Sequence, residues 1–139
     1  MSVFENVKKN FGFGCMRLPM ENDEVNIPEM TKMVDTFLDN GFNYFDTASG
    51  YLGGKSEKAL KVCLTSRYPR ESYILTNKLS NHLFKSEEEI RPAFQKQLEA
   101  CGVEYFVILN GSRFVAFPSA IRPHFDSHVI VIYDEFFQA

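Results

Sequence analysis

Three polar side chains between residues 46 and 78 have types and spacing that suit acid–base chemistry on a carbonyl group. Asp46 and Tyr51 both lie in the segment GFNYFDTASGYLGGKSE, and Lys78 ends the segment YILTNK. A tyrosine is a weak acid with a pKa of about 10, and a neighbouring ammonium group lowers that pKa because it stabilises the phenolate. A carboxylate beside the lysine keeps the ammonium charged and oriented. Such a tyrosine can protonate a carbonyl oxygen while a cofactor delivers a hydride to the carbon.

Helix and strand signals alternate between residues 28 and 106, and this alternation decides where the three side chains lie. Apolar residues at helical spacing predict helices over Pro28–Asn40, over Ser56–Ser66 and over a third stretch that ends at Cys101. Short apolar runs predict strands at Phe42–Phe45, at Ser72–Thr76 and from Tyr105 onward. Strands about 30 residues apart with helices between them indicate consecutive βαβ units, a parallel sheet and helices on one face.

Residues typical of helix ends support these boundaries. Pro28 suits a first helical position, because its missing N–H would be unbonded there anyway. The pair Asn40-Gly41 and the later Gly102 are typical of left-handed helix stops. The third helix has two alternative starts: Ser86 with Glu89 could form a capping box, whereas Pro92 favours a start at about Arg91.

The predicted strands bring the polar trio to one edge of the sheet. Asp46 falls where a strand ends, Tyr51 lies in the loop that follows, and Lys78 comes after the next strand. Functional groups of parallel α/β folds gather at the carboxyl ends of strands. Taken alone, Asp46 is better explained by a helix or turn cap, and Tyr51 by a loop aromatic with a solvated hydroxyl. Their joint spacing with the GKSE segment and Lys78 reverses this interpretation for ancestry but not for activity, since Lys78 could also be a solvated lysine at a strand end.

The segments FGFGCMRLP, GFNYFDTASGYLGGKSE and YILTNK resemble the aldo/keto reductase family, over about 95 residues. The resemblance implies that Asp46, Tyr51 and Lys78 belong to a catalytic tetrad and that NADPH, the cofactor NADP(H) in its reduced form, donates the hydride. It implies reduction of a small-molecule aldehyde or ketone, with Tyr51 as the proton donor. The implied fold is α/β, a partial TIM (β/α)8-type barrel that corresponds to roughly the first half.

The same resemblance implies a cofactor contact at the turn after the first strand. The glycine-containing stretch from Gly12 to Arg17 lies near the nicotinamide in this family. The cofactor-binding residues expected from it are Gly14, Cys15, Met16 and Arg17, together with Asp46.

The chain departs from the family pattern after residue 106. The family has a His at the end of the fourth strand, in a pattern like YFDxYLLH, whereas this chain reads YFVILNGSR, with Asn110 as the nearest polar residue. A complete barrel has about 250 residues. We therefore expect residues 1–106 to form aldo/keto reductase-like βα units of a truncated or frame-disrupted member. Residues 107–139 are expected to form a divergent, irregular and strand-rich tail, with strands at Phe114–Phe117 and Val129–Tyr133.

Composition excludes several classes of function. The net charge is −3 and no basic stripe is present, which argues against nucleic acid as a partner. No apolar run reaches the roughly 20 residues that cross a bilayer, so no membrane partner is expected. Three scattered cysteines and no signal peptide predict a cytoplasmic location. No metal site is expected, because Pro123 argues against the helix that would bring His124 and His128 together.

Two alternatives to an active reductase stay open. The chain could be a catalytically inactive truncated fragment that folds only as a homo-oligomer covering an open sheet edge. It could also be a binding module that keeps affinity for the nucleotide without turnover.

Overall fold

A parallel sheet forms the centre of the part of the chain that this computed structural model describes, which is residues 6–106, 108–111 and 131–132. Its strands lie in the order β1-β4-β5-β6-β7, and every neighbouring pair is parallel. The strands are β1 (Gly12–Gly14), β4 (Tyr44–Asp46), β5 (Ile74–Leu79), β6 (Ile108–Gly111) and β7 (Val131–Ile132). The helices are α1 (Ile27–Asp39), α2 (Lys55–Leu60) and α3 (Ile90–Cys101).

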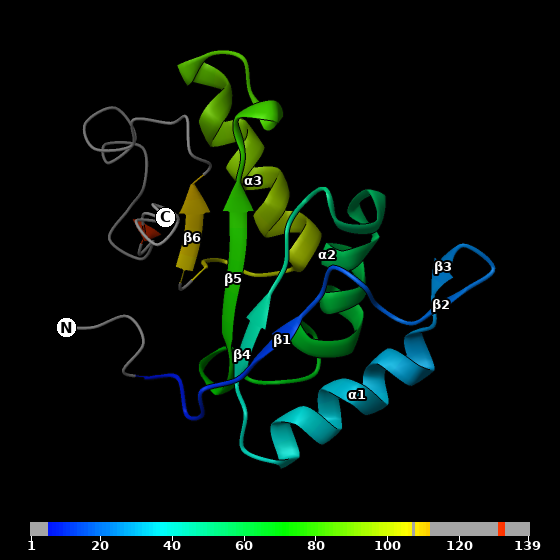
Figure 1. The fold of residues 1–139 in the computed structure, drawn as a ribbon. Helices are drawn as coiled ribbons and strands as arrows, with labels where there is room; N and C mark the ends of the chain where they lie inside the picture. Colours follow the sequence, from blue (N-terminus) through cyan, green and yellow to red (C-terminus); the bar gives the residue numbers. More distant parts are fainter. Residues whose placement is uncertain (1–5, 107, 112–130, 133–139) are drawn as a thin grey trace, which may run out of the picture.

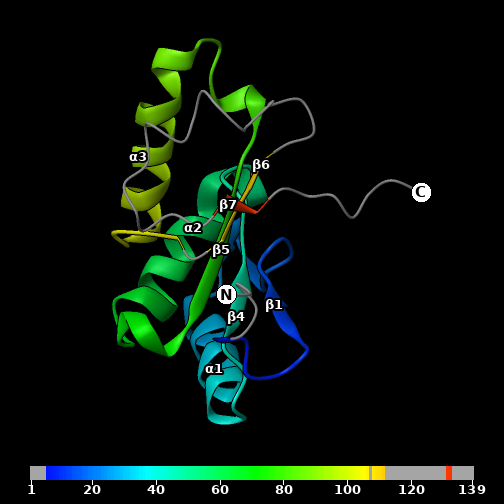
Figure 2. The same cartoon turned by 90° about the vertical axis from the view of Figure 1, so that its left-hand side faces the viewer.

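The three helices lie on one face of the sheet, as right-handed crossovers require (Figures 1 and 2). α1 connects β1 to β4, α2 connects β4 to β5, and α3 connects β5 to β6. This arrangement confirms the prediction of an α/β fold with part of a barrel. The predicted tail strand Phe114–Phe117 lies outside the described residues. The one predicted at Val129–Tyr133 is described only over β7.

The strand boundaries differ from the predicted ones because neighbouring strands decide them. β4 ends at Asp46, which pairs with Gly14 on one side and with Thr76 on the other. The prediction that the next strand ends at Thr76 was wrong. β5 runs on to Leu79 because β6 pairs with its last four residues, and Lys78 therefore lies inside a strand instead of after one.

The first two helices follow the sequence signals closely. The side chain of Asn26 accepts a hydrogen bond from the N–H of Glu29 and caps α1, with Pro28 in the first turn. Gly41, at φ +80°, terminates α1. α2 continues as a π-helical turn over Lys61–Thr65, so this helical stretch ends within one residue of the prediction.

The predicted capping box of Ser86 and Glu89 is not present at the start of the third helix. α3 follows a 3-10 turn over Glu87–Glu89, and no side chain caps its first N–H groups. The hydroxyl of Ser86 contacts a neighbouring carboxylate instead of the helix backbone. The alternative start at about Arg91 is one residue from the observed one, because Pro92 fits only the first turn. Gly102, at φ +67°, ends the helix as predicted.

Aromatic packing between α1 and the strands forms one part of the core. Phe45 is fully buried in β4 and contacts the rings of Phe13, Phe37 and Tyr73 at centroid distances of 5.1–6.5 Å. A second contact, Phe94–Phe106, joins α3 to the chain just before β6. The apolar positions predicted on the three helices belong to the same hydrophobic core. The buried ones are Met30, Val34, Phe37, Ala59, Leu60, Cys63, Leu64, Phe94, Leu98 and Cys101.

A small hairpin precedes α1 and was not predicted. β2 (Met20–Glu21) pairs with β3 (Glu24–Val25) across a two-residue turn. Both turn residues, Asn22 and Asp23, have positive φ, as the common two-residue hairpin turn requires. The hairpin projects away from the sheet (Figure 1). Asn and Asp tolerate this backbone conformation, so the pair was a usable signal.

Candidate active site

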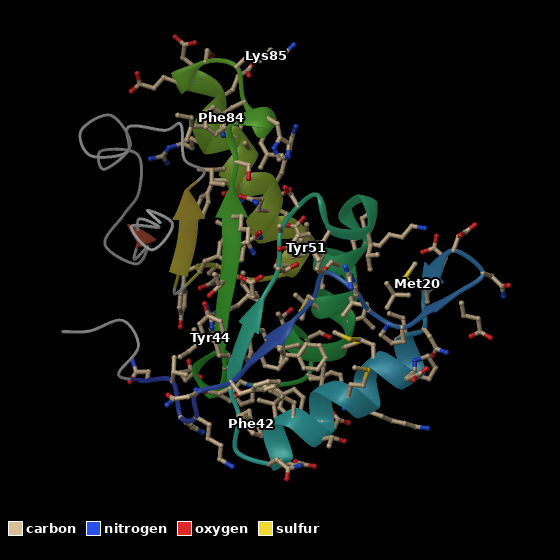
Figure 3. All side chains as sticks on the ribbon, viewed as in Figure 1. Met20, Phe42, Tyr44, Tyr51, Phe84 and Lys85 are labelled. Atoms are coloured by element: carbon tan, nitrogen blue, oxygen red, sulfur yellow. The ribbon has the colours of Figure 1, made fainter. Side chains whose placement is uncertain are left out.

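The structure brings Asp46, Tyr51 and Lys78 together at the carboxyl edge of the sheet. The Lys78 ammonium lies 2.6 Å from Oδ1 of Asp46 and also donates to the carbonyl oxygen of Thr47 at 3.1 Å. The same ammonium lies 4.9 Å from the centre of the Tyr51 ring. Figure 3 shows Tyr51 beyond the carboxyl end of β4, whereas Tyr44 lies at the opposite end of that strand. The predicted convergence of the three side chains is therefore present in the geometry.

Tyr51 is held over this edge by a strained turn. The backbone N–H of Tyr51 donates to the carbonyl of Ala48, and the chain then passes through Leu52, Gly53 and Gly54, all with positive φ. Leu52 contributes most of the strain, because a residue with a Cβ disfavours this conformation whereas glycine does not. Strain of this kind persists only where the surroundings enforce it and is frequent at functional sites.

The surroundings of Lys78 keep its side chain charged. Burial acts to lower the pKa of the ammonium. The hydrogen bond and charge of Asp46, helped by the Tyr51 phenol, outweigh burial, so the pKa of Lys78 is raised above its usual range. A permanent positive charge therefore lies beside the Tyr51 ring.

The predicted cofactor-binding residues lie at the same edge, next to Asp46. Gly12–Gly14 form β1 itself, so the prediction of a turn starting at Gly12 was wrong and the turn begins at Cys15. The N–H of Cys15 donates to the carbonyl of Asp46 at 2.9 Å. Met16 and Arg17 are exposed, whereas the Cys15 side chain is fully buried. Only the backbone of Cys15 can therefore contact a ligand in this structure.

Two hydroxyl groups tie this turn to the rest of the site. Ser56 at the start of α2 donates to the carbonyl of Cys15 at 2.9 Å. The hydroxyl of Thr47 lies 2.8 Å from that of Ser56 and must be the donor, because the Ser56 proton is already used. The ends of β1 and β4 and the start of α2 are thereby joined. The serine of the GKSE segment therefore has a structural role, because it connects the start of α2 to the turn after β1.

Cys15, Cys63 and Cys101 are free and fully buried. Burial raises the pKa of all three thiols, so little reactive thiolate forms in the folded chain. We expect Ellman's reagent to modify them at least about a thousandfold more slowly in buffer than in urea, because modification requires an opening of several kcal/mol. One thiol that reacts rapidly in buffer, identified by mass spectrometry, would contradict this packing.

A buried carboxyl group beside the site was not predicted. Glu57 of α2 is 4% exposed and accepts a hydrogen bond from the Asn77 amide nitrogen at 2.8 Å. Burial raises the pKa of Glu57, and the bond from Asn77 only partly opposes this effect. In the sequence this glutamate stands out only as part of the GKSE segment. Its partner lies 20 residues away in sequence, and periodicity does not reveal such pairs.

Glu57→Gln is expected to remove part of the pH dependence of stability. The folded chain retains a proton on Glu57 at pH values where the unfolded chain has released it, so the native chain loses stability as pH rises from about 4.5 toward the folded pKa. Relative to the native chain, the variant should gain about 1.4 kcal/mol for each unit of that pKa difference. Urea unfolding at several pH values between about 4 and 8 measures this.

The exposed Glu71→Gln is the matched control for the pH experiment. Its free energy of unfolding should follow the native pH profile, because that side chain is in water in both states. A Glu57→Gln profile parallel to that of the control would show that Glu57 ionises as readily in the fold as outside it.

Asn110, the polar residue nearest to the position of the family's histidine, lies in β6. Its backbone pairs in register with Lys78 on β5, so this position adjoins the site on the next strand. His124 and His128 lie outside the described residues.

Comparison with known proteins places the chain in a family. Residues 10–110 match the model of the aldo/keto reductase family. The chain therefore belongs to the aldo/keto reductase family, and the resemblance carried by its motifs is confirmed. No curated protein matches the sequence.

Solved structures agree with this assignment. An aldo-keto reductase from Bacillus halodurans in its holo form is 27% identical, with a TM-score of 0.60, over 73% of this chain and 35% of that chain. An enzyme of this type from Klebsiella pneumoniae in complex with NADPH is 16% identical, with a TM-score of 0.61, over 71% and 33% of the two chains. A third, from Bombyx mori in complex with NADP, is 22% identical, with a TM-score of 0.56, over 71% and 32%. The chain thus corresponds to about a third of the length of each.

Proposed function

We propose that this chain carries the proton-donating part of an NADP(H)-dependent carbonyl reductase, which reduces a small aldehyde or ketone. The observation that supports this most directly is the Asp46–Lys78 ion pair at 2.6 Å with the Tyr51 ring beside its ammonium. The family membership and the relatives crystallised with NADPH or NADP support the choice of cofactor.

The surface beside Asp46 fits a flat cofactor ring. Gly14 is exposed and pairs with Asp46, and a Cβ added to it would meet nothing within 4 Å. A planar group can therefore approach the backbone there without a steric barrier. Gly14, Met16, Arg17 and the Cys15 backbone would hold such a group. When bound, NADPH supplies the hydride for the carbonyl carbon.

The residues of the chain donate the proton and stabilise the charge that its loss leaves behind. The Tyr51 hydroxyl donates its proton to the carbonyl oxygen, so that hydride and proton together give the alcohol. The Lys78 ammonium stabilises the phenolate that remains on Tyr51. Asp46 and the Thr47 carbonyl hold that ammonium in place. This holding matters because a shift of about 1 Å in a reacting group can cost about a hundredfold in rate.

Three measurements separate this function from its alternatives. NADPH is titrated against the chain by fluorescence, and turnover is then followed with 4-nitrobenzaldehyde. Binding with turnover supports the reductase, whereas binding without turnover supports a nucleotide-binding module. Absence of both, with concentration-dependent association in sedimentation, supports an inactive fragment that covers its sheet edge by oligomerising.

Two further predictions from the sequence accompany this proposal. The chain is divided at residue 106 into βα units and a divergent tail, and its location is cytoplasmic. None of the helices in the described part of the chain is long and apolar enough to span a membrane.

A further inference from the structure

The backbone of Lys78 lies beside a gap in the sheet. β4 ends at Asp46, opposite Thr76, whereas β5 continues to Leu79. The N–H of Thr47 donates to the carbonyl of Thr76 at 2.9 Å, so the polar backbone groups of Thr76 face β4. Backbone groups of successive strand residues point to alternate sides. Those of Lys78 therefore face the same side as those of Thr76, where β4 is no longer present to bond them.

Two buried side chains satisfy these backbone groups. The N–H of Lys78 donates to Oδ1 of Asn77 at 2.8 Å. The amide nitrogen of Gln97, which projects from α3, donates to the carbonyl of Lys78 at 2.8 Å and lies 3.3 Å from the same Oδ1. Asn77 is fully buried and Gln97 is 3% exposed. Buried backbone groups need such partners, because leaving them unbonded costs free energy.

Glu57 decides which way the Asn77 amide faces. An asparagine amide has a donor end and an acceptor end of nearly equal shape, so its neighbours determine its orientation. The Glu57 carboxyl accepts from the Asn77 nitrogen at 2.8 Å. The oxygen of Asn77 is thereby directed at the Lys78 N–H. The chain of contacts thus runs from α2 through β5 to α3 and ends on the backbone of the lysine.

We propose that Glu57, Asn77 and Gln97 are positioning residues, which hold the Lys78 backbone so that its ammonium meets Asp46 and Tyr51. The proposal rests on the role given to Lys78 in the proposed function. None of the three touches the ammonium, the carboxylate of Asp46 or the phenol. They act only through the N–H and C=O of Lys78, which fix the origin of a long, flexible side chain.

The experiment observes the Lys78 ammonium directly in a chain labelled with 15N-lysine. Its proton-exchange rate with water is measured by NMR at neutral pH, and its signal is assigned with Lys78→Arg. Gln97→Met removes the donor to the Lys78 carbonyl with little change in size. Glu57→Leu removes the group that orients Asn77, and Glu57→Gln keeps an acceptor there. Asn43→Ala is the control, because Asn43 is also a 4% exposed polar residue but lies at the far edge of the sheet.

Gln97→Met and Glu57→Leu are expected to raise the ammonium exchange rate about fivefold to tenfold, the change typical of one lost hydrogen bond. Glu57→Gln should stay near the native rate. Asn43→Ala should unfold at lower urea concentration without a change in this rate. The proposal is overturned if a folded Gln97→Met or Glu57→Leu chain behaves like the Asn43 control, since the network would then serve stability alone.

The native chain offers a test that needs no variant. The backbone amide proton of Lys78 should exchange as slowly as that of Thr47, which is bonded within the sheet. Rapid exchange at Lys78 would overturn the proposal. Both readouts are independent of turnover. If both exchange rates are as expected but the chain has no reductase activity, the positioning network stands and only the proposed function is rejected.

Discussion

Tyr51→Phe is expected to lower turnover of 4-nitrobenzaldehyde by about a hundredfold to ten thousandfold, while NADPH binding stays the same. This range is typical for the loss of a positioned general acid. The variant removes only the hydroxyl that we propose as the proton donor. The ring beside the Lys78 ammonium remains, as does the exposed backbone at Gly14. The loss should therefore appear in the catalytic step and leave cofactor affinity unchanged.

Tyr68→Phe is the matched control for this experiment. Tyr68 donates to Asp35 at 2.6 Å through its own hydroxyl, away from the carboxyl edge of the sheet. Turnover in this variant should equal that of the native chain. Equal turnover in the native chain and in Tyr51→Phe would remove the tyrosine from the mechanism. A similar loss in both variants would point to folding as the cause.

Phe45→Ala is expected to lower the free energy of unfolding by about 3–5 kcal/mol, the range for truncation of a buried aromatic residue. Phe45 is fully buried at the centre of the ring cluster, and its removal leaves Phe13, Phe37 and Tyr73 without a shared partner. A single domain is stable by only about 5–15 kcal/mol. The variant should therefore unfold at much lower urea concentration, followed by circular dichroism.

Phe11→Ala tests whether the position of a ring in the cluster decides how much unfolding free energy its truncation costs. Phe11 contacts Phe37 and Phe42 but is 66% exposed, so most of its ring is already in water. Its loss should cost less than about 1 kcal/mol, because little apolar area is exposed by the change. Equal losses for Phe11→Ala and Phe45→Ala would show that the cluster is not packed as described.

Local patterns in the sequence predicted the helices well, because each pattern reports a property of one segment. Apolar spacing identified the buried faces of α1, α2 and α3, and Gly41 and Gly102 marked two helix ends through their positive φ. Where a segment had two conflicting local signals, the stronger steric constraint prevailed. Pro92 excluded the capping box at Ser86 for this reason.

The grouping of Asp46, Tyr51 and Lys78 was also accessible from sequence, because residue types and spacing sufficed to place the three side chains near one edge of the sheet. Asp46 and Tyr51 lie in one continuous segment, and Lys78 lies on the next strand. The family followed from the same segments and is confirmed over residues 10–110. The chemical type and approximate position of these residues therefore follow from the sequence.

Only the tertiary structure decided how Lys78 is held. The length of β5 depends on pairing with β6, so the sequence of β5 alone could not show that the lysine lies inside the strand. The sequence also could not reveal the roles of Glu57 and Gln97, two polar residues on helix faces that are otherwise apolar. Their partners lie about 20 residues away, on β5. Local spacing shows which face of a segment is buried, whereas hydrogen-bond partners between segments exist only once the segments are packed.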